Sequence, residues 1–321
     1  MRLFSSVAVF AAAQAASLAA VQTEIHAPGP NGSLTGTVLT PDFTKGPVVL
    51  VVPGSGPIDR DGNASNAVRA STYRLLAEGL ATHGIASVRI DKRGLYGSRA
   101  AVSDPNSVTI GDYADDVKTW ISVIRRRTAA PCVWVLGHSE GGLVALAAAQ
   151  TASDLCGLIL VSTAGRPLGA VLREQLRANP ANAPILDQAL SAIAQLETGQ
   201  RVDVTAIHPA LLPLFRPEVQ GFLINEFSID PAKLIATCRH PILIVQGDRD
   251  IQVGVGDAQR LKQANPTATL AILAHANHVL KSVVSDDRDA NVATYSDPDL
   301  PLAPGVVDVI TSFISVSRKS R

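Results

Sequence analysis

Short apolar runs rich in β-branched residues alternate with helical patterns along most of this chain. The apolar runs stand at residues 46–54, 85–90, 132–137, 157–165, 241–247 and 268–275. Helical patterns lie between or after them, at residues 71–84, 109–127, 141–150, 254–264 and 305–316. Continuous apolar runs of this kind are typical of strands that are buried on both faces of a parallel sheet. The alternation therefore predicts an α/β fold with a mainly parallel sheet.

Two segments depart from this alternation. Residues 23–41 hold two strand-like runs around the turn sequence GPNG, which predicts a β-hairpin. Residues 166 to about 237 contain several helical patches and no convincing strand. We therefore expect one domain of ordinary enzyme size over residues 21–321, with a helical cap inserted at about 166–237 over one end of the sheet.

The first 20 residues are typical of a secretory signal peptide. Arg2 is followed by a short apolar stretch and then by small residues in the patterns Ala13-Gln14-Ala15 and Ser17-Leu18-Ala19. Polar residues interrupt the stretch, so it is a poor membrane span, and no cysteine lies near the cleavage region. The sequence predicts a secreted or periplasmic protein without stable membrane insertion.

The overall charge argues against one class of partner. The chain has 28 basic and 28 acidic residues, so its formal net charge is zero. This balance gives no electrostatic basis for binding nucleic acid.

The three cysteines leave two interpretations open. Cys132, Cys156 and Cys238 each stand close to the start of a predicted strand. An exported protein can form disulfides, and similar positions relative to their strands slightly favour a Cys132–Cys156 pair with one free thiol. Three buried thiols are the equal alternative.

The sequence GHSEG at residues 137–141 lies between a predicted strand and a predicted helix. A Gly-X-Ser-X-Gly motif in this context is a nucleophile elbow, in which a strained turn exposes the serine. We therefore expect Ser139 to be a catalytic nucleophile, with a purely structural turn serine as the alternative.

A serine nucleophile needs a base, and the base needs an orienting carboxylate. In elbow-type hydrolases these follow in the order Ser, Asp or Glu, His. The strand at 241–247 is followed by Asp248 and Asp250, and the strand at 268–275 leads to His275 and His278. Asp250 and His278 are the predicted members of the triad, because each lies far enough along its loop to fold back toward the serine.

An oxyanion hole requires two backbone N–H groups aimed at the developing charge. Glu140, which follows the nucleophile, is one expected donor. The loop after the strand at 46–52 is glycine-rich, so Ser55 and Gly56 are the candidates for the second donor. A simple glycine-rich turn is the alternative. The charged residues at 59–61 and 91–93 follow neighbouring strands, and we expect them to pair and fix this loop.

At this point the chain resembles the serine esterase and lysophospholipase-like group of the α/β-hydrolases. The residues that carry the resemblance are PGSGPIDRDGN (53–63), DKRGLYGS (91–98), GHSEGG (137–142), GDRDIQV (247–253), ANHVLK (276–281) and residues 293–314. The resemblance implies an eight-stranded hydrolase sheet with helices on both faces, supports the triad, and implies no metal or organic cofactor. One departure is that Pro53-Gly54 stands where the wider superfamily has a His-Gly oxyanion motif.

These features predict a serine carboxylic ester hydrolase that acts on a small-molecule ester, with a short to medium acyl chain. Apolar residues of the cap, at 208–217 and 221–227, could line an acyl pocket. One alternative is a serine aminopeptidase-like enzyme, which would need a cap acid to hold the substrate amine. Four such acids are available: Glu174, Glu197, Glu218 and Glu226. A non-catalytic binding protein on the same scaffold is the other alternative.

Overall fold

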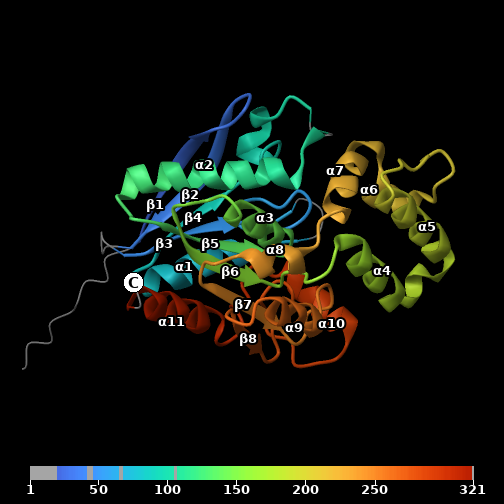
Figure 1. The fold of residues 1–321 in the computed structure, drawn as a ribbon. Coiled ribbons are helices and arrows are strands. Elements are labelled where there is room, and N and C mark those ends of the chain that lie inside the picture. The colour runs from blue at the N-terminus through green and yellow to red at the C-terminus, as the bar shows by residue number, and fades with distance from the viewer. Residues whose placement is uncertain (1–19, 42–45, 65–67, 105–106, 320–321) are drawn as a thin grey trace, which may run out of the picture.

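An eight-stranded sheet forms the centre of the computed structural model, which describes residues 20–41, 46–64, 68–104 and 107–319 (Figure 1). Its strands are β1 (Val21–Pro28), β2 (Ser33–Thr40), β3 (Val48–Val52), β4 (Ala86–Ile90), β5 (Val133–His138), β6 (Leu155–Val161), β7 (Ile242–Gly247) and β8 (Thr269–Leu273). Their order across the sheet is β1-β2-β4-β3-β5-β6-β7-β8. The hairpin β1–β2 and the pair β2–β4 are antiparallel, and the remaining pairs are parallel. The predicted fold class is confirmed.

Helices cover both faces of this sheet. Helices α2 (Ile110–Thr128), α3 (Glu140–Ala149) and α9 (Val255–Ala264) pack with one face, and α1 (Thr72–Thr82) and α11 (Val306–Lys319) pack with the other. Alternate residues of β3 point to opposite faces, so that Leu50 joins the first core and Val49 joins the second. This explains why the strand sequence is continuously apolar instead of alternating.

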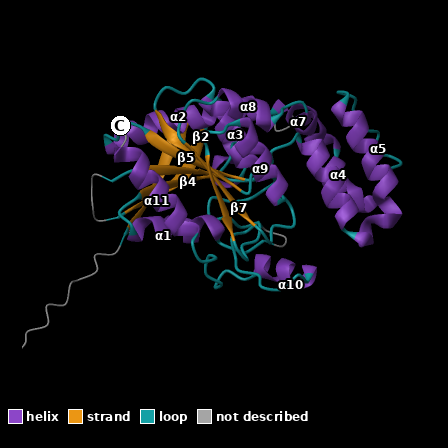
Figure 2. Cartoon of the chain, turned by 60° about the horizontal axis from the view of Figure 1, so that its bottom comes forward, coloured by secondary structure: helices purple, strands orange, loops and turns teal. Residues whose placement is uncertain are grey.

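The chain between β6 and β7 is helical, as predicted. It contains α4 (Leu168–Ala178), α5 (Leu186–Glu197), α6 (Leu212–Phe215), α7 (Pro217–Phe227) and α8 (Pro231–Thr237). Figure 2 shows α4 and α5 standing away from the sheet, whereas α8 lies beside α3 and α9. Helices α4 to α7 have an apolar core of their own, which includes Ile193, Phe215 and Phe227. We call α4 to α7 the cap.

The remaining elements are short. Helix α10 spans Arg288–Ala293, and 3₁₀ segments lie at Tyr96–Ala101, Pro180–Ile185, Pro209–Leu211 and Thr294–Ser296. In the part of the chain that the structure describes, no helix combines the length and apolar character needed to cross a membrane. The predicted signal peptide at residues 1–20 lies outside the described residues, except for Ala20.

Cys132 and Cys156 form a disulfide, and Cys238 is a buried free thiol. The disulfide joins the residue before β5 to the second residue of β6. Of the two interpretations that the sequence leaves open, the structure therefore has the single-disulfide arrangement.

Candidate active site

Ser139 occupies a sharp turn between the end of β5 and the start of α3. Its backbone has φ 55° and ψ −121°, a region that side-chain-bearing residues rarely adopt. A Cβ on Gly137 would lie 2.2 Å from the carbonyl oxygen of Gly141, so the crossing of strand and helix leaves no room for a side chain there. The motif therefore builds the elbow geometry that the sequence predicts, with Ser139 at its apex.

The structure brings Asp250 and His278 together. Asp250 lies in the loop after β7, and its Oδ2 is 2.8 Å from His278 Nδ1. Because a carboxylate can only accept, Nδ1 carries the hydrogen and Nε2 is left to accept a proton. Burial raises the pKa of Asp250, but the His278 ring and the N–H groups of Val253 and Gln252 outweigh burial and lower it below its usual value. Asp250 is therefore a carboxylate at neutral pH.

Gln246, the buried residue next to the end of β7, holds Asp250 in place. Its Nε2 lies 3.1 Å from Asp250 Oδ2 and also donates to the carbonyl oxygen of Val253. The other carboxylate oxygen accepts the N–H groups of Gln252 and Val253 at 2.8 and 2.9 Å. Three hydrogen bonds, besides the one to His278, thus fix the carboxylate that orients this ring.

Ser139 and His278 border the same cavity. Within the described chain, no hydrogen bond joins Ser139 Oγ to His278. A bond between nucleophile and base is often long without substrate and tightens in the complex. Asp248 and His275, the alternative acid and base, do not join this arrangement. The backbone N–H of His275 donates to Asp248 Oδ1 at 2.7 Å instead.

The loop after β3 comes close to the nucleophile. A Cβ on Gly54 would lie 3.2 Å from Ser139 Cβ. The Gly54 N–H is already used, since it donates to Tyr73 Oη at 3.0 Å. Among the described residues, no acceptor is found for the N–H groups of Ser55 and Gly56, which border the cavity. Glu140 begins α3, so the helix provides its N–H with no acceptor either.

Tyr73 and His138 connect this loop to the loop of His278. Tyr73 Oη lies 3.0 Å from His138 Nδ1, and His138 Nε2 lies 2.8 Å from the carbonyl oxygen of His278. The carbonyl can only accept, so Nε2 carries the hydrogen and Nδ1 accepts the Tyr73 hydroxyl proton. Burial, followed by the charge of His278, lowers the pKa of His138 to about 3, so this ring stays neutral. We call the bonds from Gly54 through Tyr73 and His138 to His278 the relay.

The predicted pairing between the two neighbouring loops is confirmed for Arg60 and Asp91, whereas Lys92 and Arg93 pair with Glu140 and Asp116 instead. Arg60 donates to Asp91 through its side chain at 2.7 and 3.0 Å and through its backbone N–H at 2.9 Å. Arg89, which is buried in β4, pairs with Asp61. These contacts join the loop after β3, which carries the expected donors Ser55 and Gly56, to the end of β4 and limit the movement of this loop.

Lys92 makes a contact that the sequence does not reveal. Its buried Nζ lies 2.7 Å from Glu140 Oε1 and 2.7 Å from the carbonyl oxygen of Gly54. Burial lowers the pKa of Lys92, but the Glu140 carboxylate and the neighbouring Tyr113 outweigh burial and raise it. Lys92 is therefore a cation that links the two segments carrying the expected oxyanion donors.

The cavity beside Ser139 has a volume of about 610 Å³, within the range of about 300–1,000 Å³ usual for small-molecule sites. Core and cap both line it. Its apolar lining includes Val108, Leu143, Val171, Leu172, Phe222 and Leu223. Such a cavity can hold the apolar part of a small substrate against the nucleophile.

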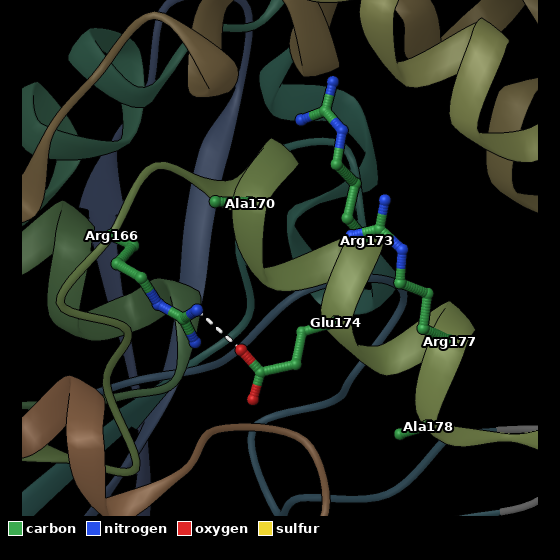
Figure 3. A pocket seen from close by; sticks show the side chains of 6 residues that line it. All are labelled: Arg166, Ala170, Arg173, Glu174, Arg177 and Ala178. Carbon is green, nitrogen blue, oxygen red and sulfur yellow. Dashed lines mark hydrogen bonds and ion pairs between the residues drawn. The ribbon is translucent and has the colours of Figure 1, made fainter.

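Arg166 ties the start of the cap to the core. Its guanidinium donates to both carboxylate oxygens of Asp257 in α9, at 2.9 and 2.7 Å, and to Glu174 in α4 at 2.6 Å. Figure 3 shows Arg166 facing Glu174, with Arg173 and Arg177 farther along the same helix. Arg166 also borders the cavity, so this junction lies beside the candidate site.

Sequence reasoning does not single out Tyr73, His138 or Gln246, and it does not predict the contact of Lys92 with Glu140. His138 had one available signal, because it directly precedes the nucleophile within the GHSEG motif. The other three are ordinary residues of a helix, a strand and a loop. Only the folded chain shows which atoms they contact.

Comparison with known proteins places these features in context. The sequence profile of the family described as serine aminopeptidase, S33, matches residues 67–205. No curated protein matches the sequence. Among solved structures, Est1E from Butyrivibrio proteoclasticus is 15% identical, with a TM-score of 0.56 and coverage of 92% of this chain and 99% of that one.

Two further structures are similar in fold. The Pyrococcus furiosus esterase Pf2001 is 16% identical, with a TM-score of 0.56 and coverage of 92% of this chain and 93% of that one. The Pyrococcus horikoshii acylaminoacyl peptidase is 14% identical, with a TM-score of 0.55 and coverage of 93% of this chain and 41% of that one. At such identities the likeness shows a shared fold.

Proposed function

We propose that the chain is a serine hydrolase of the α/β-hydrolase superfamily and that it hydrolyses carboxylic esters with short to medium acyl chains. The observation that carries this proposal is the His278–Asp250 pair at 2.8 Å, on the wall of the cavity that also exposes Ser139. The bounded apolar wall of the cavity supports a small acyl group as its occupant.

In the proposed reaction, Ser139 Oγ attacks the acyl carbonyl carbon while His278 Nε2 takes the serine proton. Asp250 holds the imidazole and stabilises its charged form. The negative oxygen that develops on the substrate accepts N–H bonds from Glu140 and from Ser55 or Gly56. His278 then gives its proton to the departing alcohol, which leaves an acyl-enzyme. Water, activated by His278, releases the acid and restores Ser139.

Labelling with a fluorophosphonate tests the mechanism. We expect a single adduct on Ser139, found by peptide mass mapping, and a loss of labelling in His278→Ala, since the hydroxyl then has no base. A panel of p-nitrophenyl esters graded by acyl length tests the substrate class. No labelling of folded protein would contradict the proposed triad, and faster cleavage of a long-chain ester than of the butyrate would contradict the proposed chain length.

A serine aminopeptidase-like activity is the second candidate, favoured by the family profile. It needs an anionic group for the substrate amine, and two cap acids, Glu218 and Glu226, border the cavity. The Glu218 side chain is 59% exposed and faces Arg216. Burial, followed by the charge of Glu140, raises the pKa of Glu226 well above its usual value, which weakens Glu226 as an anionic partner for an amine. Neither acid is a strong amine site, which supports the ester over the amine-bearing substrate.

A non-catalytic binding protein is the third candidate function. Such a protein would not need the Gln246, Gln252 and Val253 hydrogen bonds that hold Asp250 against His278. Hydrogen bonds that fix the orientation of a single carboxylate support a catalytic role instead.

We also propose that the protein is secreted or periplasmic. The signal-peptide pattern at residues 1–20 motivates this proposal. The disulfide between Cys132 and Cys156 supports it, because disulfides persist mainly in oxidising compartments.

A further inference from the structure

Glu226 is a buried carboxyl group that the proposed reaction does not use. It lies near the end of α7, is 3% exposed, and borders the cavity. Its side-chain carboxyl group forms neither a hydrogen bond nor an ion pair with the described residues of the chain. A buried carboxyl without a partner is costly, so its natural partner is a group inside the cavity.

The fold holds Glu226 firmly in this position. The preceding residue, Asn225, accepts the N–H of Ile110 through its Oδ1 at 2.9 Å, which fixes α7 to the start of α2. On the other side, Phe227 is buried in the apolar core of the cap. These two neighbours fix the backbone of Glu226 at the wall of the cavity.

The surroundings of Glu226 favour a neutral ligand group. Lys92 and Glu140 are paired with each other at 2.7 Å, and Tyr113 of α2 borders the same part of the site. A substrate carboxylate would lie beside the carboxyl groups of Glu140 and Glu226, and Lys92 is already bonded to Glu140 and to the Gly54 carbonyl oxygen. Burial raises the pKa of Glu226, so Glu226 is a weak anionic partner for a substrate ammonium. A neutral polar group meets neither penalty.

We infer that Glu226 binds a hydroxyl group of the substrate, so that the preferred esters carry a hydroxyl on their acyl or alcohol part. This inference rests on the proposed ester hydrolysis. A hydroxyl both donates and accepts, so it satisfies the carboxyl group whether or not that group is protonated. Leu143 and Phe222, which line the same cavity, carry no group that could bind the hydroxyl in place of Glu226. Glu226 is then a specificity-determining residue.

Two pairs of esters test the inference with the full mature protein. Ethyl 3-hydroxybutyrate against ethyl butyrate places the hydroxyl on the acyl side, and glyceryl monobutyrate against propyl butyrate places it on the alcohol side. We expect kcat/KM, measured by pH-stat titration, to be about tenfold higher for the hydroxylated member of one pair, as one hydrogen bond to a buried group provides. In Glu226→Leu this ratio falls to about one. In Glu226→Gln, which still donates and accepts, part of the ratio remains.

Glu197→Leu is the matched control. Glu197 is also a cap acid, but it pairs with Arg173 and does not border the cavity. Its removal should leave the ratio as in the wild type. Rates of fluorophosphonate labelling show that each variant keeps a folded site.

Three results separate the possible failures. A wild-type ratio near one for both pairs, with all four esters hydrolysed, overturns the role of Glu226 and leaves the ester hydrolase standing. Hydrolysis of none of the esters removes the proposed function itself. A preference for ethyl 3-aminobutyrate over ethyl butyrate that Glu226→Leu abolishes overturns the inference too, because Glu226 would then be an anion that binds an amine.

Discussion

Tyr73 joins two loops that must act together, although it touches no reacting atom in the proposed mechanism. Its hydroxyl accepts the Gly54 N–H and donates to His138, whose ring holds the backbone of His278. We predict that Tyr73→Phe lowers kcat about 10- to 100-fold for p-nitrophenyl butyrate, since small displacements of catalytic groups are costly. KM should stay within about twofold because no cavity wall is lost. Steady-state kinetics provide both values.

The split between kcat and KM separates this positioning role from simple loss of stability. Tyr73→Phe leaves two buried polar groups unpaired and should lower the free energy of unfolding by about 1–3 kcal/mol. Ile310→Val in α11 removes one buried methyl group on the same side of the sheet and costs about 0.5–1.5 kcal/mol. Its kcat should match the wild type. An equal fall of kcat in both variants would show that the relay has no specific role.

The residues of the candidate site differ in how far sequence reasoning could reach them. Ser139 follows from a motif, and Asp250 and His278 follow from chain order and the ends of two strands. The relay could not be predicted in this way, because Tyr73 and His138 are 65 positions apart and meet only across the folded sheet. The sequence does not distinguish Glu226 from the three other cap acids. Only the structure shows that α7 places Glu226 at the wall of the cavity.

At the scale of elements, Arg166 is the link between cap and core. Asp257, its partner in α9, has a fully buried side chain, and the Gly165 N–H at 3.0 Å is its other partner. We predict that Arg166→Met lowers the free energy of unfolding by about 1–3 kcal/mol, as expected for lost bonds between charged groups. A loosened cap should also raise KM severalfold and speed proteolytic cleavage within residues 166–237. Limited proteolysis followed by mass mapping checks this.

Arg173→Met makes the same chemical change within the cap alone. Arg173 pairs with Glu197 of α5 through two bonds, and within the described chain it forms no hydrogen bond or ion pair with α9. Its proteolysis rate and KM should stay close to those of the wild type. Equal protection of the Arg166 and Arg173 variants would mean that apolar packing alone holds the cap in place.

The elements themselves were predictable to different degrees. The buried strands were evident because both faces of β3, β5, β6 and β7 are covered, which makes their sequences apolar throughout. The segment from α4 to α7 was recognisable as helical, but not its arrangement. The position of this segment depends on single polar contacts such as Arg166–Asp257 and Ile110–Asn225. Hydrophobic periodicity does not predict such contacts.

For the molecule as a whole, the disulfide provides a constraint that the apolar core does not. Cys132 and Cys156 are separated by 24 positions, and closing a loop of this length contributes about 3 kcal/mol in the chain-entropy account. For a domain of this size, that corresponds to a change in Tm of about 5 °C. We predict this loss in the Cys132→Ala/Cys156→Ala double variant and in wild-type protein treated with dithiothreitol, measured by calorimetry.

Cys238→Ala is the control, because the buried Cys238 thiol takes no part in the disulfide. Its Tm should still fall when dithiothreitol is added, whereas the double variant should no longer respond. Mass analysis of protein that is denatured and alkylated directly after cell lysis then connects stability to location. A single alkylated thiol, Cys238, agrees with folding in an oxidising compartment. Three alkylated thiols would contradict both the disulfide and the proposed export, since a cytosolic chain would keep Cys132 and Cys156 reduced.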